Sequence, residues 1–178
     1  MERGQVLLAH PLLEDENFHR GVILITEHDE EGTVGLMLND QTTFHWPDAL
    51  EGTWPKAPLH IGGPVDQDMV FFLHCRPDII PQARSIDGFL HWGGEFEAMH
   101  TALRDGLLAP GHIRFFAGYS GWSPGQLTAE INEGSWAVIP GKSVNCLSPQ
   151  RELYQALKNQ LPPDFRLWSN APKEPQLN

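Results

Sequence analysis

Cysteines, long apolar runs and basic residues are all scarce in this chain. Its two cysteines, Cys75 and Cys146, lack metal-ligand spacing, so we expect two small buried residues, with one disulfide as the open alternative. The longest apolar runs, such as Val22–Thr26, stop far short of the ~18 residues that span a bilayer. The stretch up to Pro11 is too short and polar for a secretory signal. These shortages predict a cytoplasmic protein without a membrane segment.

The scarcity of positive charge bears on the partner. Lysine and arginine number 12 against 23 aspartates and glutamates, which gives a net charge of −11. Neutralisation of phosphates by lysine and arginine provides most non-specific affinity for nucleic acids, and no stretch of this chain has a basic excess. We therefore expect no appreciable affinity for DNA or anionic membranes, and a partner that is a small molecule or a protein.

The apolar content is sufficient for a core. The 178 residues are 40% hydrophobic and include 9 Phe and 6 Trp. A chain of this size buries about 70% of its unfolded surface as one domain. We predict a single domain over residues 1–170, whereas residues 171–178 have the composition of a disordered tail.

The pattern along the chain predicts strands first and helices later, which favours an α+β fold over a regular βαβ array. Residues 40–57 are expected to be a loop with room for one helical turn, and Asp29–Gly32 to be a four-residue hairpin connection. The expected strands are Gln5–Ala9, Gly21–Glu27, Thr33–Asn39, Leu59–Ile61, Met69–His74, His112–Gly118 and Trp136–Ile139. Helices are expected from Gly94 to about Leu107, from Ser123, and from Ser148 to Leu161.

The helix at Ser123 has the strongest start signal. Ser123, Pro124 and Gln126 form a capping-box pattern with Ser123 as the cap, and Trp122 would pack on Leu127 as a hydrophobic staple. Gln126 and Glu130 lie four residues apart and could orient a ligand, although a solvated helix face is the more frequent explanation for such a pair.

Several residues are candidates for catalysis or for binding of a metal or an anion. The nine histidines include no ligand pair at strand or helix spacing, so no metal and no cofactor are predicted. Ser120 lies in Gly118–Trp122, which resembles a nucleophile elbow but has Trp122 where a glycine is needed. His74 and Cys75 are neighbours on a strand and therefore point to opposite faces. The turn at Gly62 and Gly63 could present backbone N–H groups to an anion, but Asp66 and Asp68 follow it.

Taken together, several segments resemble the YqgE/AlgH family over residues 4 to about 140. They are Leu7–Pro11, Phe18–Val22, Glu27–His28, Gly35–Asn39, Gly62–Val65, Phe72–His74, Gly118–Trp122 and Gly125–Leu127 with Glu130. The resemblance implies a mixed, strongly curved, barrel-like sheet flanked by a few helices. This chain departs from the family pattern at His10, at Asp40 in place of a basic residue, and at Ser120, which is often alanine in relatives.

The resemblance implies no catalytic activity, although some members of the family are labelled transcriptional regulators. We expect a binding domain rather than an enzyme; the alternatives are a regulator and a hydrolase that uses Ser120 or His74. The expected ligand site joins Asn39, Gly62, Gly63, His74 and Ser120 around one cleft, since polar groups that converge on an apolar wall suit a ligand. The competing interpretation is that these residues end strands separately, with Asn39 and His74 bonded to local backbone.

Overall fold

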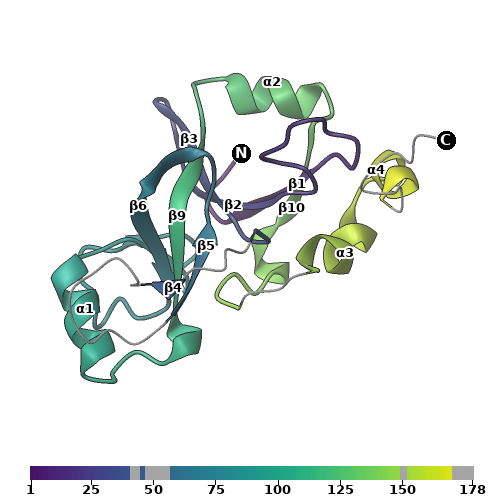
Figure 1. The fold of residues 1–178 in the computed structure, drawn as a ribbon. Coiled ribbons are helices and arrows are strands. Elements are labelled where there is room, and N and C mark those ends of the chain that lie inside the picture. Colours follow the sequence, from purple (N-terminus) through teal and green to yellow (C-terminus); the bar gives the residue numbers. More distant parts are fainter. Residues whose placement is uncertain (41–44, 47–56, 149–151, 170–178) are drawn as a thin grey trace.

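The computed structural model describes residues 1–40, 45–46, 57–148 and 152–169, and it has a mixed α+β architecture (Figure 1). The expected tail lies outside the described residues. The strands are β1 (Gln5–Ala9), β2 (Val22–Asp29), β3 (Gly32–Met37), β4 (His45–Trp46), β5 (Ala57–Ile61), β6 (Val65–His74), β7 (Arg84–Ser85), β8 (His91–Trp92), β9 (Ile113–Trp122) and β10 (Trp136–Pro140). The helices are α1 (Phe96–Arg104), α2 (Gln126–Asn132), α3 (Leu153–Leu157) and α4 (Pro163–Trp168), with 3₁₀ turns η1 (Pro110–His112), η2 (Gly141–Ser143) and η3 (Lys158–Gln160).

Strand β9 is the centre of the sheet. The strand order is β10-β1-β2-β3-β9-β6-β8-β7, and β5 also pairs with β9. One edge of β9 carries β6, while the other is divided between β5, opposite residues 115–117, and β3, opposite residues 120–122. The β5–β9 pairing is parallel and the others are antiparallel. The mixed sheet that the resemblance implied is therefore confirmed.

The sheet bends but stays open. Irregularities interrupt the register between Ile25 and Glu27 in β2 and between Val65 and Val70 in β6, and such bulges increase local twist. In Figure 1, β6 and β9 run steeply down the view while β2 crosses it. Among the described residues β10 and β7 do not pair, so the sheet is not a closed barrel.

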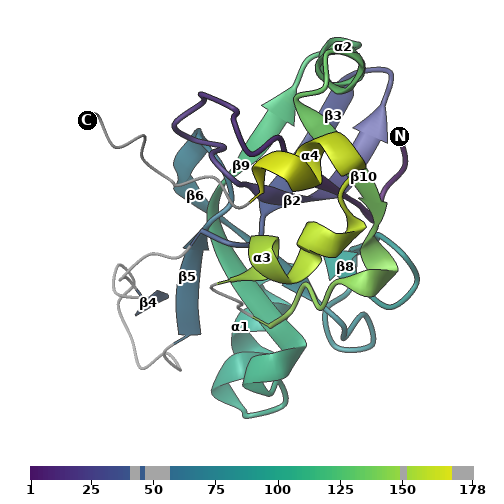
Figure 2. The same ribbon diagram turned by 90° about the vertical axis from the view of Figure 1, so that its right-hand side faces the viewer.

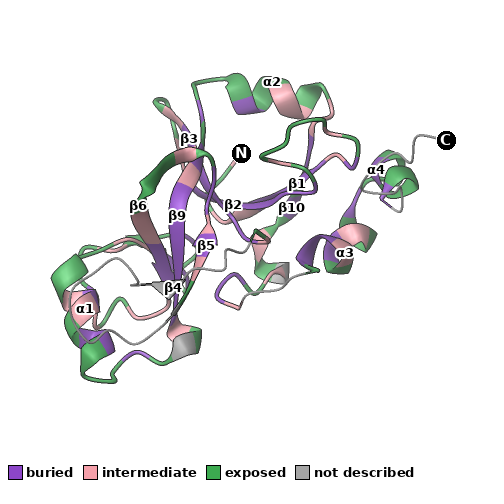
Figure 3. Ribbon diagram, viewed as in Figure 1, coloured by how far each residue is buried: buried purple, intermediate pink, exposed green. Residues whose placement is uncertain are grey.

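Both faces of the sheet are covered at β1 and β2, which explains why these two strands are apolar without alternation. In β1, Val6 and Leu8 pack in the cluster that includes residues of α3 and α4, whereas Leu7 and Ala9 pack on the opposite face with Leu127 of α2. Figure 2 shows α3 and α4 lying over β2. A third cluster joins α1 to β6 and β9, and Figure 3 shows how buried residues follow β9.

The start of α2 differs from the prediction. The main-chain N–H of Gln126 donates to the Ser123 carbonyl over 3.0 Å, and Gly125 has φ +79°. Proline second and a left-handed glycine third make a type II turn, so the helix begins at Gln126 with Gly125 as its cap. Ser123 as side-chain cap was therefore wrong. Half of the capping box remains, because the Ser123 N–H donates to the Gln126 Oε1 over 3.0 Å.

Two other boundaries are corrected. Asp29 pairs with Gly32, so two residues connect β2 to β3 rather than four. The last expected helix is present as α3 with η3, and α4 follows as a separate helix that was not predicted, because Pro162 and Pro163 follow Leu161 and proline cannot continue a helix interior. The expected start of that helix at Ser148 falls partly on residues 149–151, outside the described residues.

No helix in the described part of the chain combines the length and the apolar character needed to cross a membrane.

Candidate functional site

Gly62, Gly63 and Ser120 come together where β5 ends beside β9. The Gly62 carbonyl accepts the main-chain N–H of Met37 over 2.8 Å and the Ser120 hydroxyl over 3.1 Å. Ser120 is fully buried. Its hydroxyl therefore ties β9 to the Gly62 turn, and it donates to a carbonyl oxygen rather than to a general base.

Asn39 follows β3 and closes its pairing with β2. Its Oδ1 accepts the Val22 N–H over 2.8 Å, and its Nδ2 donates to the Arg20 carbonyl over 2.8 Å. The amide side chain thus takes the place of one more backbone pair at the end of the ladder.

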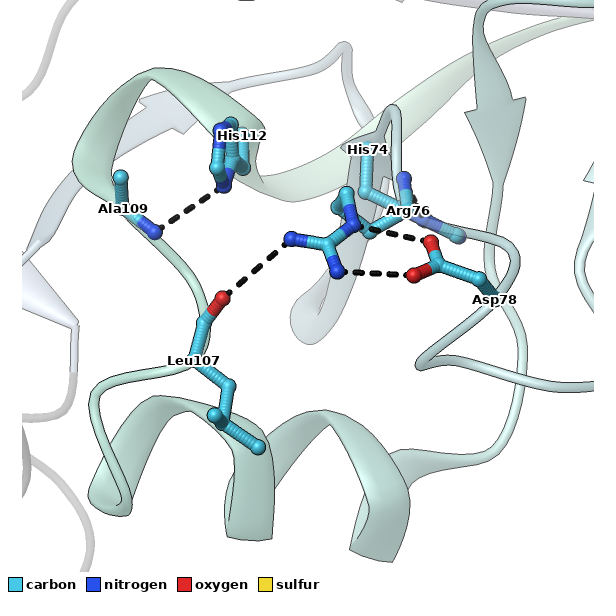
Figure 4. Close-up of polar contacts among 6 residues, drawn as sticks. All are labelled: His74, Arg76, Asp78, Leu107, Ala109 and His112. Atoms are coloured by element: carbon cyan, nitrogen blue, oxygen red, sulfur yellow. Dashed lines mark hydrogen bonds and ion pairs between the residues drawn. The ribbon is translucent and has the colours of Figure 1, made fainter.

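His74, drawn next to Arg76 in Figure 4, ends β6 beside the start of β9. It is fully buried and pairs with Ile113, seven residues before Ser120 on β9, which is about 23 Å along a strand. Its Nδ1 accepts the Arg76 N–H over 3.1 Å, so a neutral ring donates from Nε2 to the Gly93 carbonyl over 3.0 Å. Burial is the main cause that lowers the pKa of His74.

The five predicted site residues therefore occupy three places in the fold. Gly62, Gly63 and Ser120 share one junction, Asn39 bonds to the backbone of Arg20 and Val22, and His74 bonds to the backbone of Arg76 and Gly93. None of these bonds links two of the three places to one another. That any of them binds a ligand stays a prediction.

The pair Gln126 and Glu130 does not form a simple solvated face. The Glu130 carboxylate accepts the indole N–H groups of Trp122 and Trp136 over 2.9 and 2.8 Å, and the Gln126 amide over 2.9 Å. Phe18 stacks on Trp122 with 6.1 Å between ring centroids. This group, which we call the Trp122 cluster (Phe18, Trp122, Glu130 and Trp136), anchors α2 on the sheet.

One cavity lies between the β7–β8 turn and the connection from β10 to α3. This cleft has a volume of about 710 Å³. Its wall is mainly apolar, with a few polar side chains among the apolar ones. The apolar residues include Leu24, Leu90, Val144, Cys146 and Leu147, and the polar ones are Asp87, Lys142, Asn145 and Ser148. None of the five predicted site residues lines it, and none of its polar residues was singled out from the sequence.

A second cavity, of about 420 Å³, lies between residues 16–20, the end of β3 and α3. Asn39, Arg20 and Tyr154 line it. The Tyr154 hydroxyl donates to the Ala9 carbonyl over 2.7 Å, and burial raises the pKa of Tyr154 to about 12. This phenol is therefore neutral and engaged in a structural bond.

Arg114 is buried behind the wall of the cleft. Only 3% of it is exposed, and its guanidinium donates to the carbonyls of Cys146 over 3.0 Å and Leu38 over 2.6 Å. The guanidinium carbon lies 5.0 Å from the centre of the Phe116 ring. No carboxylate in the described ranges forms an ion pair with it. Burial lowers the pKa of Arg114 to about 10, so the group keeps its positive charge at neutral pH.

His60 lies beside this charge. Only 2% of it is exposed, and His60 pairs with Phe116 across β5 and β9, so its ring shares a face of the sheet with Arg114. Burial first, and then the charge of Arg114, lower the pKa of His60 to about 4, against a hydrogen bond to the Asp40 backbone that raises it. Histidine at this position is therefore neutral in the folded protein at physiological pH.

This depressed pKa predicts an acid-sensitive fold. Between pH 6.5 and 4 the unfolded chain binds a proton that folded His60 excludes, so the free energy of unfolding falls as the pH drops through this window. The full stabilisation is present above pH 6.5, and the total loss at this site is about 3 kcal/mol. His60→Leu should flatten the dependence seen in urea melts from pH 7 to 4. His19→Gln, which replaces an exposed histidine, is the control, and an unchanged slope in His60→Leu would contradict the assignment.

Comparison with known proteins settles the family. A family model described as AlgH-like matches residues 6–166. This chain belongs to the AlgH-like family. A UPF0301 protein of Parabacteroides distasonis is 38% identical over 184 residues, which cover 99% of this chain and 91% of the relative. Another, from Chlorobaculum parvum, is 36% identical and covers 100% of this chain and 96% of its own length.

Two solved structures of similar fold support the membership. The crystal structure of protein DIP2367 from Corynebacterium diphtheriae has a TM-score of 0.73 at 27% identity, over 96% of this chain and 92% of that one. The solution structure of the AlgH protein from Pseudomonas aeruginosa has a TM-score of 0.69 at 27% identity, over 95% and 93%. The resemblance found in the sequence is thus confirmed.

Two departures from the AlgH-like pattern have structural roles in this chain. His10 packs edge-on against Phe165 of α4, with 4.5 Å between ring centroids, and its Nδ1 accepts the Leu12 N–H. Ser120 supplies the bond to Gly62 that an alanine would lack. Both polar substitutions are satisfied within the fold.

Within the described ranges, no three His, Cys, Asp or Glu side chains are placed to share a metal ion.

Proposed function

We propose that this AlgH-like chain is a cytoplasmic binding domain for a small molecule and that the cleft beside Leu90 and Val144 is its site. The observation that carries the proposal is the cleft itself. A volume of about 710 Å³ with an apolar wall and few polar groups has the size and lining of small-molecule sites.

The two alternative functions have weaker support. A hydrolase would need a nucleophile in contact with a base, but buried Ser120 donates to a backbone carbonyl and His74 lies near the other end of β9. A transcriptional regulator would need a basic surface for phosphates, against a net charge of −11. We infer that a nucleic acid is not the partner.

The binding function is tested with a neutral apolar probe, N-phenyl-1-naphthylamine. We expect saturable one-to-one binding, followed by fluorescence, with amide shifts in NMR spectra at the residues that line the cleft, most of them in 87–90 and 141–148. Val144→Trp should fill the cleft and weaken binding about tenfold or more, a change of about 1.4 kcal/mol. Val138→Trp, on the exposed face of β10, is the matched control and should bind as the native chain does. Absent saturation, or equal binding by both variants, would refute the proposal.

A further inference from the structure

We infer that the ligand of the cleft carries a negatively charged group on an apolar body, an inference that rests on the proposed function. It starts from the hydrogen-bonding capacity that the cleft leaves open. Ser148 Oγ accepts the Asn145 amide over 3.1 Å, which leaves the Ser148 hydroxyl proton available to donate. Lys142 lines the same wall, is exposed and carries donors only. These two side chains can donate hydrogen bonds to a ligand that carries acceptor atoms.

Backbone N–H groups use part of the acceptor capacity of the cleft. Asp87 is its one carboxylate, and Asp87 Oδ1 accepts the N–H groups of Phe89 and Leu90 over 3.0 and 2.7 Å. Asn145 Oδ1 accepts the Leu147 N–H over 3.3 Å. These bonds use one of the two Asp87 oxygens, so Asp87 remains a negative charge at the cleft that the positive groups must outweigh.

The buried positive charge of Arg114, behind the wall of the cleft, also favours an anionic ligand. The Arg114 guanidinium donates to the carbonyl of Cys146, a residue that lines the cleft, and no carboxylate in the described part of the chain pairs with it. A charge in the low-dielectric interior is weakly screened, so it acts on a neighbouring cavity more strongly than a surface charge would. Two positive charges, Lys142 in the wall and Arg114 behind it, thus stand against the single negative charge of Asp87.

The overall negative charge does not cancel this local effect. Charges on the exposed surface are screened beyond about 10 Å at 0.1 M salt. The net charge of −11 thus slows the approach of an anion without setting its affinity inside the cleft. An apolar body packs against Leu90 and Leu147 while the anionic group faces Lys142 and Ser148.

A matched pair of probes tests the charge preference. The dye 8-anilinonaphthalene-1-sulfonate has the ring system of the neutral probe and adds one sulfonate. Lys142→Gln should weaken binding of the sulfonate dye about threefold to fivefold, the effect of one partly exposed charge pair, and leave the neutral probe unchanged. Asp87→Asn keeps an oxygen for the turn and should strengthen the sulfonate dye alone. Lys158→Gln, which replaces a lysine outside the cleft, is the control.

The outcomes separate the two proposals. If the neutral probe does not bind, the proposed function fails. If the neutral probe binds in the cleft but the sulfonate dye responds to neither Lys142→Gln nor Asp87→Asn, the binding function stands and the anionic ligand is refuted. Opposite changes of sulfonate affinity in the two variants, with constant affinity for the neutral probe, support the inference.

Discussion

Trp122→Ala is expected to lower the free energy of unfolding by about 3–5 kcal/mol, the range for removing a large aromatic side chain from a core. Trp122 is buried against Leu127 and Phe18 in the cluster that holds α2 on the sheet. Its indole N–H also donates to Glu130 over 2.9 Å. Urea unfolding followed by far-UV circular dichroism measures the loss.

Two milder variants, one at Trp122 and one at the adjacent Ser123, set the scale for this loss of stability. Trp122→Phe keeps a ring but removes the N–H that Glu130 accepts, so we expect a smaller loss of about 1–2 kcal/mol. Ser123→Ala should change stability by less than about 0.5 kcal/mol, because Ser123 makes no side-chain cap bond to α2. Should Trp122→Ala melt like Ser123→Ala, the Trp122 cluster does not anchor the helix.

The strands with strong local patterns could be predicted from the sequence. Gln5–Ala9 was expected as a strand and is β1, because its apolar residues are buried on both faces. The β7 and β8 strands were not predicted. Each has two residues, too few for any periodicity, and they form because Trp92 pairs with Arg84 in a hairpin and with Leu73 of β6, 19 residues away in the sequence. The divided edge of β9 depends on other long-range pairings, those with β3 and β5.

The start of α2 shows where a local rule misleads. Ser-Pro-x-Gln matches a capping box, but the x is Gly125, which adopts the left-handed conformation that a type II turn needs. That turn uses the Ser123 carbonyl to accept the Gln126 N–H, so the first helical residue is Gln126 rather than Pro124. Gly125 directly after Pro124 is the feature of the sequence that indicates a type II turn.

The cleft had no comparable signal in the sequence. Asp87 lies in a turn and Asn145 in a connection, where polar residues are ordinary. Their proximity depends on β10 pairing with β1 at one end of the sheet and on the β7–β8 hairpin at the other. The predicted site residues were instead the conspicuous strand ends, whose polar groups the backbone uses itself.

Gly63 is held against the backbone of β9 with no room for a side chain. A Cβ added at Gly63 would overlap the main-chain atoms of Tyr119 and Ser120, which cannot move without breaking the pairing of β9. The neighbouring Gly62 is fixed by the bonds of its carbonyl to Met37 and Ser120. The close approach of these two backbones accounts for the glycines here.

Gly63→Ala is therefore expected to cost about 3 kcal/mol or more, since overlap with rigid backbone lies at the upper end of overpacking penalties. Gly111→Ala is the matched control: an added Cβ there meets nothing within 4 Å, and stability should change by less than about 0.5 kcal/mol. Urea melts of the two variants and the native chain provide the comparison. A variant Gly63→Ala that fails to fold agrees with the prediction when Gly111→Ala folds normally. Equal stability of the two would mean that β9 and the Gly62 turn are farther apart than the structure places them.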